Sequence, residues 1–196
     1  DVSGSMSDPA GADTADTKLE LAKQAAVDAL DDFKDDDQVG LRIFSTGLGP
    51  AENQNYLDLV PIGPIGANRE MLRRQIQNLV PMRSTPLYDV AGASYQEVLA
   101  GYDPTKINAV LLLTDGRNDD GNSADDADQQ TGLVNMIRQG STGESSKPVR
   151  VFTIGYGTDA DMASLRSISE ASNAAAYNAT DASSISQVFT QVVSNF

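Results

Sequence analysis

The feature that most constrains the fold of this chain is the alternation of two apolar patterns. Short apolar runs are typical of strands, and apolar residues three or four positions apart are typical of helices. The most apolar run, Ala109 to Leu113, is Ala-Val-Leu-Leu-Leu and indicates a strand buried on both faces. Such runs alternate with helical patterns along the sequence. This order predicts a mostly parallel sheet with helices on both faces.

The ends of these elements can be placed from capping and breaking residues. Asn68 is suited to cap a helix, and Pro86 to begin one. Strands are predicted at 39–44, 56–62, 109–113, 149–154 and 174–177. Helices are predicted at 18–33, from Asn68 to Leu79, from Pro86 to about Leu99, and at 133–138, 161–171 and 185–193. The expected fold is therefore a doubly wound α/β domain, and its length indicates a single domain over 1–196.

The composition excludes several classes of function. The chain has 28 acidic and 14 basic residues, a net charge of −14, which argues against nucleic acid and anionic membrane as partners. It has no cysteine and no histidine, so disulfides, thiolate nucleophiles and histidine-based catalysis are excluded. No apolar run is long enough to span a membrane.

Oxygen-bearing side chains occur in three separate segments, each at a predicted strand-to-helix junction. The segments are Asp1-Val2-Ser3-Gly4-Ser5-Met6, Ser84-Thr85-Pro86-Leu87-Tyr88-Asp89 and Leu113-Thr114-Asp115-Gly116. The carboxyl ends of parallel strands share one edge of a sheet, and ligands bind there. We therefore expect the three segments to meet at that edge.

The chemistry of these oxygens suits a hard divalent cation. Mg²⁺ prefers octahedral oxygen ligands and retains some water. Two carboxylates and three hydroxyls leave such an ion only partly neutralised, so a carboxylate from outside could take the sixth position. Capping of a turn or of a helix is the competing interpretation for each of these side chains.

Together the three segments resemble the metal-ion-dependent adhesion site of the von Willebrand factor A family. The resemblance implies that the ligands are Asp1, Ser3, Ser5, Thr85 and Asp115. It also implies Mg²⁺ as the cofactor, with Mn²⁺ or Ca²⁺ as alternatives, and exchange of Thr85 and Asp115 between direct and water-mediated contact. The Asn118-Asp119-Asp120 run is similar to that of actinobacterial exported members.

The sequence departs from the family pattern at two places. In the family a central strand ends at the first aspartate, and we expect that strand to lie upstream of Asp1, in a longer precursor. Arg83 and Ser84 stand where many members carry glycines. Arg83 could contact an acidic ligand, or it could simply face solvent.

The resemblance implies recognition or adhesion, in which the metal binds an Asp or Glu side chain of a partner protein. No catalytic residue is expected. One alternative is a metal-dependent phosphoryl-transfer enzyme, although Ser3 stands where a second carboxylate would be needed. Another is a scaffold domain of a larger or ATPase-linked assembly, with a structural metal. An extracellular or cell-surface location in a bacterium is expected, with the cytoplasm as the alternative.

The loop over residues 116–130 is rich in aspartate, most densely between Asp119 and Asp128. Its spacing does not match the calcium-binding loop of an EF-hand. We expect a solvated rim that helps to shape the ligand-binding face, and a second metal site is the alternative.

Overall fold

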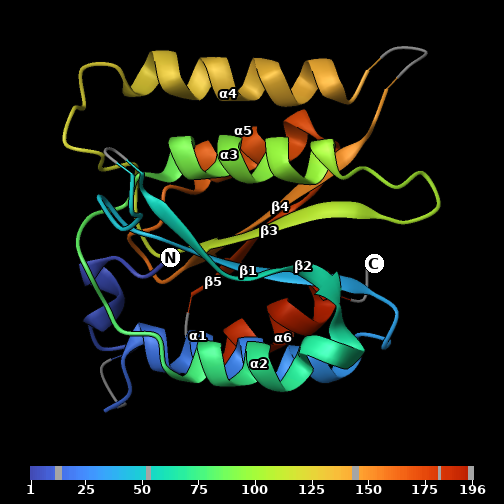
Figure 1. Ribbon diagram of the computed structural model, residues 1–196. Helices are drawn as coiled ribbons and strands as arrows, with labels where there is room; N and C mark the ends of the chain where they lie inside the picture. Colours follow the sequence, from blue (N-terminus) through green and yellow to red (C-terminus); the bar gives the residue numbers. More distant parts are fainter. Residues whose placement is uncertain (12–14, 52–53, 143–145, 181, 194–196) are drawn as a thin grey trace. The chain divides into compact units, whose positions relative to one another are not determined.

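The computed structural model describes residues 1–11, 15–51, 54–142, 146–180 and 182–193 (Figure 1). The chain divides into two compact units, each with its own sheet. The first unit comprises Asp1–Thr85 and Ala179–Phe196, and the second comprises Pro86–Asn178. Each unit is described by itself below.

The first unit combines an antiparallel pair of strands with helices that pack on the pair and on one another. Its strands are β1 (Gln38–Phe44) and β2 (Tyr56–Pro64). Its α-helices are α1 (Lys18–Ala29), α2 (Ile65–Gln77) and α6 (Ala182–Val193), and its 3-10 helices are η1 (Gly4–Ser7) and η2 (Leu30–Asp32). Helix α2 packs on both strands, and α1 packs on α2 and α6.

The register of β1 and β2 is supported by a cross-strand charge pair. Arg42 lies opposite Asp58, and its Nε donates to the Asp58 Oδ1 over 2.7 Å. The Arg42 guanidinium also lies 4.0 Å from the centre of the Tyr56 ring. Slipping the register by one residue would turn these side chains to the opposite face of the sheet.

The helices and strands of the first unit enclose an apolar core. Burying one such side chain contributes roughly 1.5–3 kcal/mol. The buried members of this core are Leu30, Val60, Ile65, Leu72 and Ile76.

Helix α2 begins earlier than predicted, because loop carbonyls satisfy its first N–H groups. The Ile65 N–H donates to the Asp37 carbonyl over 2.8 Å, and the Gly66 N–H donates to the Asp35 carbonyl over 3.0 Å. A Cβ on Gly66 would lie 2.8 Å from the Cβ of Asp35, so glycine permits this approach. The prediction that Asn68 caps this helix is therefore wrong.

In the second unit, helices cover a three-stranded sheet. Its strands are β3 (Asn108–Thr114), β4 (Val149–Tyr156) and β5 (Ala176–Ala179), in the order β3-β4-β5, with β3 and β4 parallel. Its helices are α3 (Leu87–Ala100), α4 (Asp126–Gly140) and α5 (Met162–Ala171). Helices α3 and α5 pack on the sheet, and α4 packs on α3 and α5 as an outer layer (Figure 1).

The two parallel strands β3 and β4 differ in how deeply their residues are buried. Apart from the exposed Arg150, every residue of β4 is buried, as expected for the middle strand. The predicted two-sided burial of the run from Ala109 to Leu113 is wrong, because only Leu112 of that run is buried. In the part of the chain that the structure describes, β3 pairs with β4 and stands last in the strand order.

Two further predicted boundaries are wrong. The helix predicted at 133–138 begins at Asp126. Asp126 and Asp128 lie in its first turn, where negative side chains interact favourably with the positive end of the helix dipole. The strand predicted at 174–177 is shifted to Ala176–Ala179. The C-terminal turn of α5 occupies the preceding residues, with Asn173 at φ 56° and the Ala174 N–H bonded to the Ser169 carbonyl.

The other predicted strands and helices are confirmed, with ends that differ by a few residues. The predicted α/β class, of the Rossmann-like type, is also confirmed. Among the described residues, no helix has both the length and the apolarity needed to cross a bilayer.

Candidate functional site

The first predicted segment gathers its oxygens within a few residues at the start of the first unit. The Ser3 backbone N–H donates to the Asp1 Oδ1 over 2.7 Å, and the Ser3 and Ser5 hydroxyls lie 3.1 Å apart. Ser3 is 1% exposed, and Asp1 and Ser5 are half-buried. One carboxylate and two hydroxyls therefore lie close together, partly removed from water.

Helix capping does not explain the Ser3 hydroxyl. Ser3 occupies the N-cap position of η1, yet its side chain makes no capping hydrogen bond there. The hydroxyl instead pairs with that of Ser5. A backbone hydrogen bond from the Gly4 N–H to the Arg83 carbonyl, over 2.6 Å, holds this segment in place.

The second predicted segment approaches the first through the residues just before Thr85. The Met82 N–H donates to the Val2 carbonyl over 2.6 Å, next to the bond between Gly4 and Arg83. Thr85 is 5% exposed. The N-cap of α3 is Pro86, so Thr85 precedes the capping position and is not the cap of that helix.

Asp115, the remaining predicted ligand, lies in the second unit. It directly follows β3 and is 0% exposed, and the Gly116 N–H donates to the Thr114 Oγ1 over 3.2 Å. Four of the five predicted ligands thus belong to the first unit and Asp115 to the second. The structure brings Asp1, Ser3 and Ser5 together and places the segment leading to Thr85 against them.

One residue near the site, Asn118, was missed as a functional candidate by sequence reasoning. Its Oδ1 accepts from the Tyr88 N–H over 3.2 Å, and its Nδ2 donates to the Asp126 Oδ1 over 2.7 Å. Asn118 therefore connects the start of α3 with the loop that follows Asp115. An asparagine three residues after the strand-end aspartate is the signal that could have drawn attention to it.

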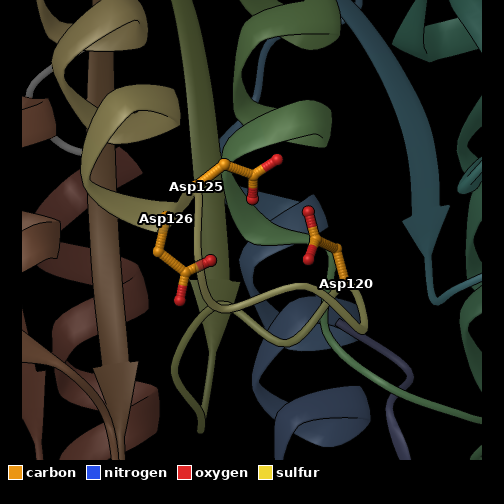
Figure 2. Close-up of side chains that lie close together, drawn as sticks. All are labelled: Asp120, Asp125 and Asp126. Atoms are coloured by element: carbon orange, nitrogen blue, oxygen red, sulfur yellow. The ribbon is translucent and has the colours of Figure 1, made fainter.

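The aspartate-rich loop forms a second group of oxygens, within the second unit. Carboxylate oxygens of Asp120, Asp125 and Asp126 lie within 4.8 Å of one another (Figure 2). The three residues are half-buried, whereas Asp119 and Asp128 are exposed. The first three aspartates are therefore partly exposed members of the loop expected to form a solvated rim.

Side-chain amides hold the carboxylates of this loop. Gln129 Nε2 donates to the Asp120 Oδ2 over 2.7 Å and to the Asp125 Oδ1 over 2.9 Å. The Asn122 N–H donates to the Asp120 Oδ1 over 2.9 Å. The Gln129 amide, followed by this backbone N–H, lowers the pKa of Asp120. Hydrogen bonds from within the chain thus help to stabilise the close approach of these three carboxylates.

Comparison with known protein families gives a match over nearly the whole chain. The family described as von Willebrand factor type A domain matches residues 1–191. No curated protein matches the sequence.

Solved structures support the same fold. A structure titled von Willebrand factor type A from Catenulispora acidiphila has 20% identity and a TM-score of 0.69, and the match covers 98% of this chain but 40% of that one. The PilB minor pilin from Streptococcus sanguinis has 14% identity and a TM-score of 0.73, covering 99% of this chain and 59% of the pilin. An aerotolerance-related membrane protein from Bacteroides fragilis has 17% identity and a TM-score of 0.68, covering 100% and 96%.

Proposed function

Because the chain belongs to the von Willebrand factor type A domain family, we propose that it recognises a partner protein through a bound divalent cation. Domains of this family commonly mediate protein–protein interaction. The proposed ligands are Asp1, Ser3, Ser5, Thr85 and Asp115, and Mg²⁺ is the proposed ion. An Asp or Glu side chain of the partner would supply the remaining ligand.

One observation carries this proposal: the Ser3 and Ser5 hydroxyls lie 3.1 Å apart in the segment whose Ser3 N–H contacts the Asp1 carboxylate, and the Ser3 hydroxyl makes no helix cap. Burying polar groups costs free energy unless they gain compensating interactions. Coordination of a hard cation would provide such an interaction, because Mg²⁺ binds carboxylate, hydroxyl and water oxygens. The oxygens present in this segment therefore fit the proposed ion.

The contacts of the segment that leads to Thr85 add support. The bonds from Gly4 to Arg83 and from Met82 to Val2 tie together the backbone segments that carry these ligands. In the second unit, the bond from Tyr88 to Asn118 ties the residues after Thr85 to the loop after Asp115. The place of Asp115 among the ligands rests on the family motif.

The balance of charge in the proposed ligand set favours binding of a carboxylate. Two carboxylates and three neutral hydroxyls would leave the bound ion attractive to an anionic side chain. Attraction between unit charges at 4 Å is about 4 kcal/mol at a surface-like dielectric, and desolvation removes much of it. A single metal contact would then orient the partner, and surrounding contacts would add affinity.

We propose a binding role without catalysis. The chain has no histidine or cysteine to act as base or nucleophile, and the proposed site offers hydroxyls where metal-dependent phosphoryl transfer would need further carboxylates. We also propose a bacterial cell-surface or exported location, as in the actinobacterial members that the sequence resembles. Fractionation of the native cells with an antibody against the domain would test that location.

Calorimetry with Mg²⁺ and Mn²⁺ tests the proposed site. We expect one ion to bind the unaltered protein, and Asp115→Asn to weaken binding by about a hundredfold through loss of one carboxylate charge. Asp119→Asn is the matched control, since Asp119 is an exposed aspartate of the neighbouring loop. Equal affinities for Asp115→Asn and the unaltered protein would overturn the site.

Removal of the metal separates recognition from a structural role. With a short peptide that carries aspartate as probe, we expect binding in Mg²⁺ and loss of binding in EDTA. Removal of either kind of metal lowers the melting temperature, because any ion bound to the native state stabilises it, so a metal that only stabilises the fold is recognised by its effect on peptide binding. At temperatures well below that melt, peptide binding would then remain the same.

A further inference from the structure

A cavity of about 280 Å³ opens in the first unit beside the backbone segment that leads to Thr85. It is lined by Thr46, Gly47, Leu48, Met82 and Arg83. The lining therefore offers a hydroxyl, two apolar side chains and a guanidinium. This volume is below that of most small-molecule sites and is suited to one or two side chains of a partner.

The backbone at Arg83 is held firmly from two sides. Its N–H donates to the Ser45 Oγ over 2.9 Å, and its carbonyl accepts from the Gly4 N–H over 2.6 Å. Ser45 is 0% exposed, and its hydroxyl also donates to the Ser84 carbonyl over 3.0 Å. Arg83 therefore projects from a fixed point, immediately beside the residues proposed to bind the ion.

The guanidinium of Arg83 is available to a partner. Arg83 is exposed, and across the described ranges its guanidinium makes no ion pair or hydrogen bond. Other arginines are paired, including Arg42 with Asp58 and Arg69 with Asp35. In a chain of net charge −14, such a cation would attract an acidic group from outside.

Gly47 allows the guanidinium to lie where it does. A Cβ at this position would lie 2.9 Å from the Arg83 Nη1, and Gly47 has a φ of 63°, in the left-handed region. A larger residue would be strained at this φ, and the guanidinium would have to move aside. The guanidinium thus lies beside Gly47, where both line the cavity.

Apolar side chains line the cavity together with this cation. They are Leu48 and Met82, and Met82 is 43% exposed. Exposed apolar side chains in a group favour contact with another protein. Methionine adapts readily to the shape of a partner.

We propose that this cavity binds an acidic side chain of the partner protein together with an adjacent aliphatic residue. The carboxylate pairs with Arg83, and the aliphatic side chain packs on Met82 and Leu48. This inference rests on the proposed function, because it adds a second contact for the partner whose first acidic side chain binds the ion. Arginine suits this role, since its planar fork binds both carboxylate oxygens.

The probe is the synthetic peptide acetyl-Gly-Glu-Leu-Asp-Leu-Gly-amide, titrated into ¹⁵N-labelled protein in Mg²⁺ and, separately, in EDTA. Arg83→Ala should weaken binding about threefold to fivefold in both conditions, with partial recovery in Arg83→Lys. Amide signals of Gly47 and Leu48 should shift on binding. Arg166→Ala is the matched control, because Arg166 is an exposed arginine on α5.

The outcomes separate the two proposals. The cavity proposal is overturned if Arg83→Ala and Arg166→Ala change peptide affinity equally, or if the unaltered protein fails to bind the peptide at about 1 mM. Equal peptide affinity in Mg²⁺ and EDTA, with the Arg83 effect intact, would overturn the metal-dependent function and leave the cavity. Far-ultraviolet circular dichroism checks that each variant is folded.

Discussion

Two groups of side-chain oxygens, one in residues 1–5 and one in the loop containing Asp120, Asp125 and Asp126, differ in their hydrogen-bond partners. In the first group a single carboxylate lies beside two hydroxyls that bond to one another. In the second group three carboxylates lie within 4.8 Å and accept hydrogen bonds from the side-chain amides of Gln129 and Asn118. The richer concentration of charge is in the second group.

This difference shows why the number of carboxylates is a poor guide to a metal site. Amide donors within the chain already compensate part of the charge of the second group, and each hydrogen bond to a charged group contributes about 1.5–3 kcal/mol. The first group combines carboxylate and hydroxyl oxygens, which a hard divalent cation binds. We therefore expect the ion at the group with fewer charges, and the following predictions test that expectation.

The largest expected effect is on metal affinity at Asp1. Asp1→Asn keeps the acceptor for the Ser3 N–H but removes one of the two proposed negative ligands. Mn²⁺ affinity should fall about a hundredfold, and Asp125→Asn should change it less than about twofold. Isothermal titration calorimetry measures both. A larger loss in Asp125→Asn would reverse the comparison between the two groups.

The next effect is on stability, at Asn118. Asn118→Ala removes the acceptor of the Tyr88 N–H and the donor to Asp126. The free energy of unfolding should fall by about 2 kcal/mol, because a backbone donor and a half-buried carboxylate lose their partners. Urea denaturation measures this loss. An unchanged denaturation midpoint would show that the amides do not hold the loop.

A smaller effect is expected at Thr85. Thr85→Val preserves the shape of a buried side chain but removes its hydroxyl. Mn²⁺ affinity should fall about tenfold, less than for a carboxylate, because a neutral ligand contributes less Coulomb energy. Titration calorimetry beside a thermal melt separates metal loss from unfolding. Affinity equal to that of the unaltered protein would remove Thr85 from the ligand set.

The smallest effect concerns the pH dependence of the acidic loop. Hydrogen bonds, chiefly from the Gln129 amide, lower the pKa of Asp120 in the folded protein. A lowered folded pKa contributes stability above the unfolded pKa, and that contribution is lost as pH falls through the folded pKa. Gln129→Ala should therefore lower stability by less than about 1 kcal/mol at neutral pH, since Asp120 is largely solvent-screened.

Denaturation midpoints at several pH values between neutral and strongly acidic check this prediction. The difference between Gln129→Ala and the unaltered protein should shrink as the solution becomes acidic. A difference that stays constant over this range would assign the effect of Gln129 to packing. A difference that grows would contradict the direction of the Asp120 shift.

Much of the fold could be predicted, because periodicity reports burial within each element. The pattern of β4 and the helix ending at Ala171 were found in this way. Boundaries set by distant partners could not be predicted. Helix α2 begins at Ile65 because carbonyls of Asp35 and Asp37 accept its first N–H groups, and no local pattern reveals those acceptors.

In the candidate site, too, local sequence patterns predict some features and distant contacts determine others. The grouping of Asp1, Ser3 and Ser5 follows from their spacing, and the structure confirms that they lie together. The hydrogen bonds between Tyr88 and Asn118 and between Gln129 and Asp120 depend on how the loop folds back on itself. Composition predicts a loop there but does not predict which amide contacts which carboxylate.

The most direct test of the account is a crystal of the protein soaked in Mn²⁺, with the ion located by anomalous scattering. We expect one strong peak about 2.1–2.2 Å from oxygens of Asp1, Ser3 and Ser5 or from waters bound to them, with Thr85 and Asp115 completing the shell. A peak among Asp120, Asp125 and Asp126, with none beside Ser3 and Ser5, would contradict the central claim.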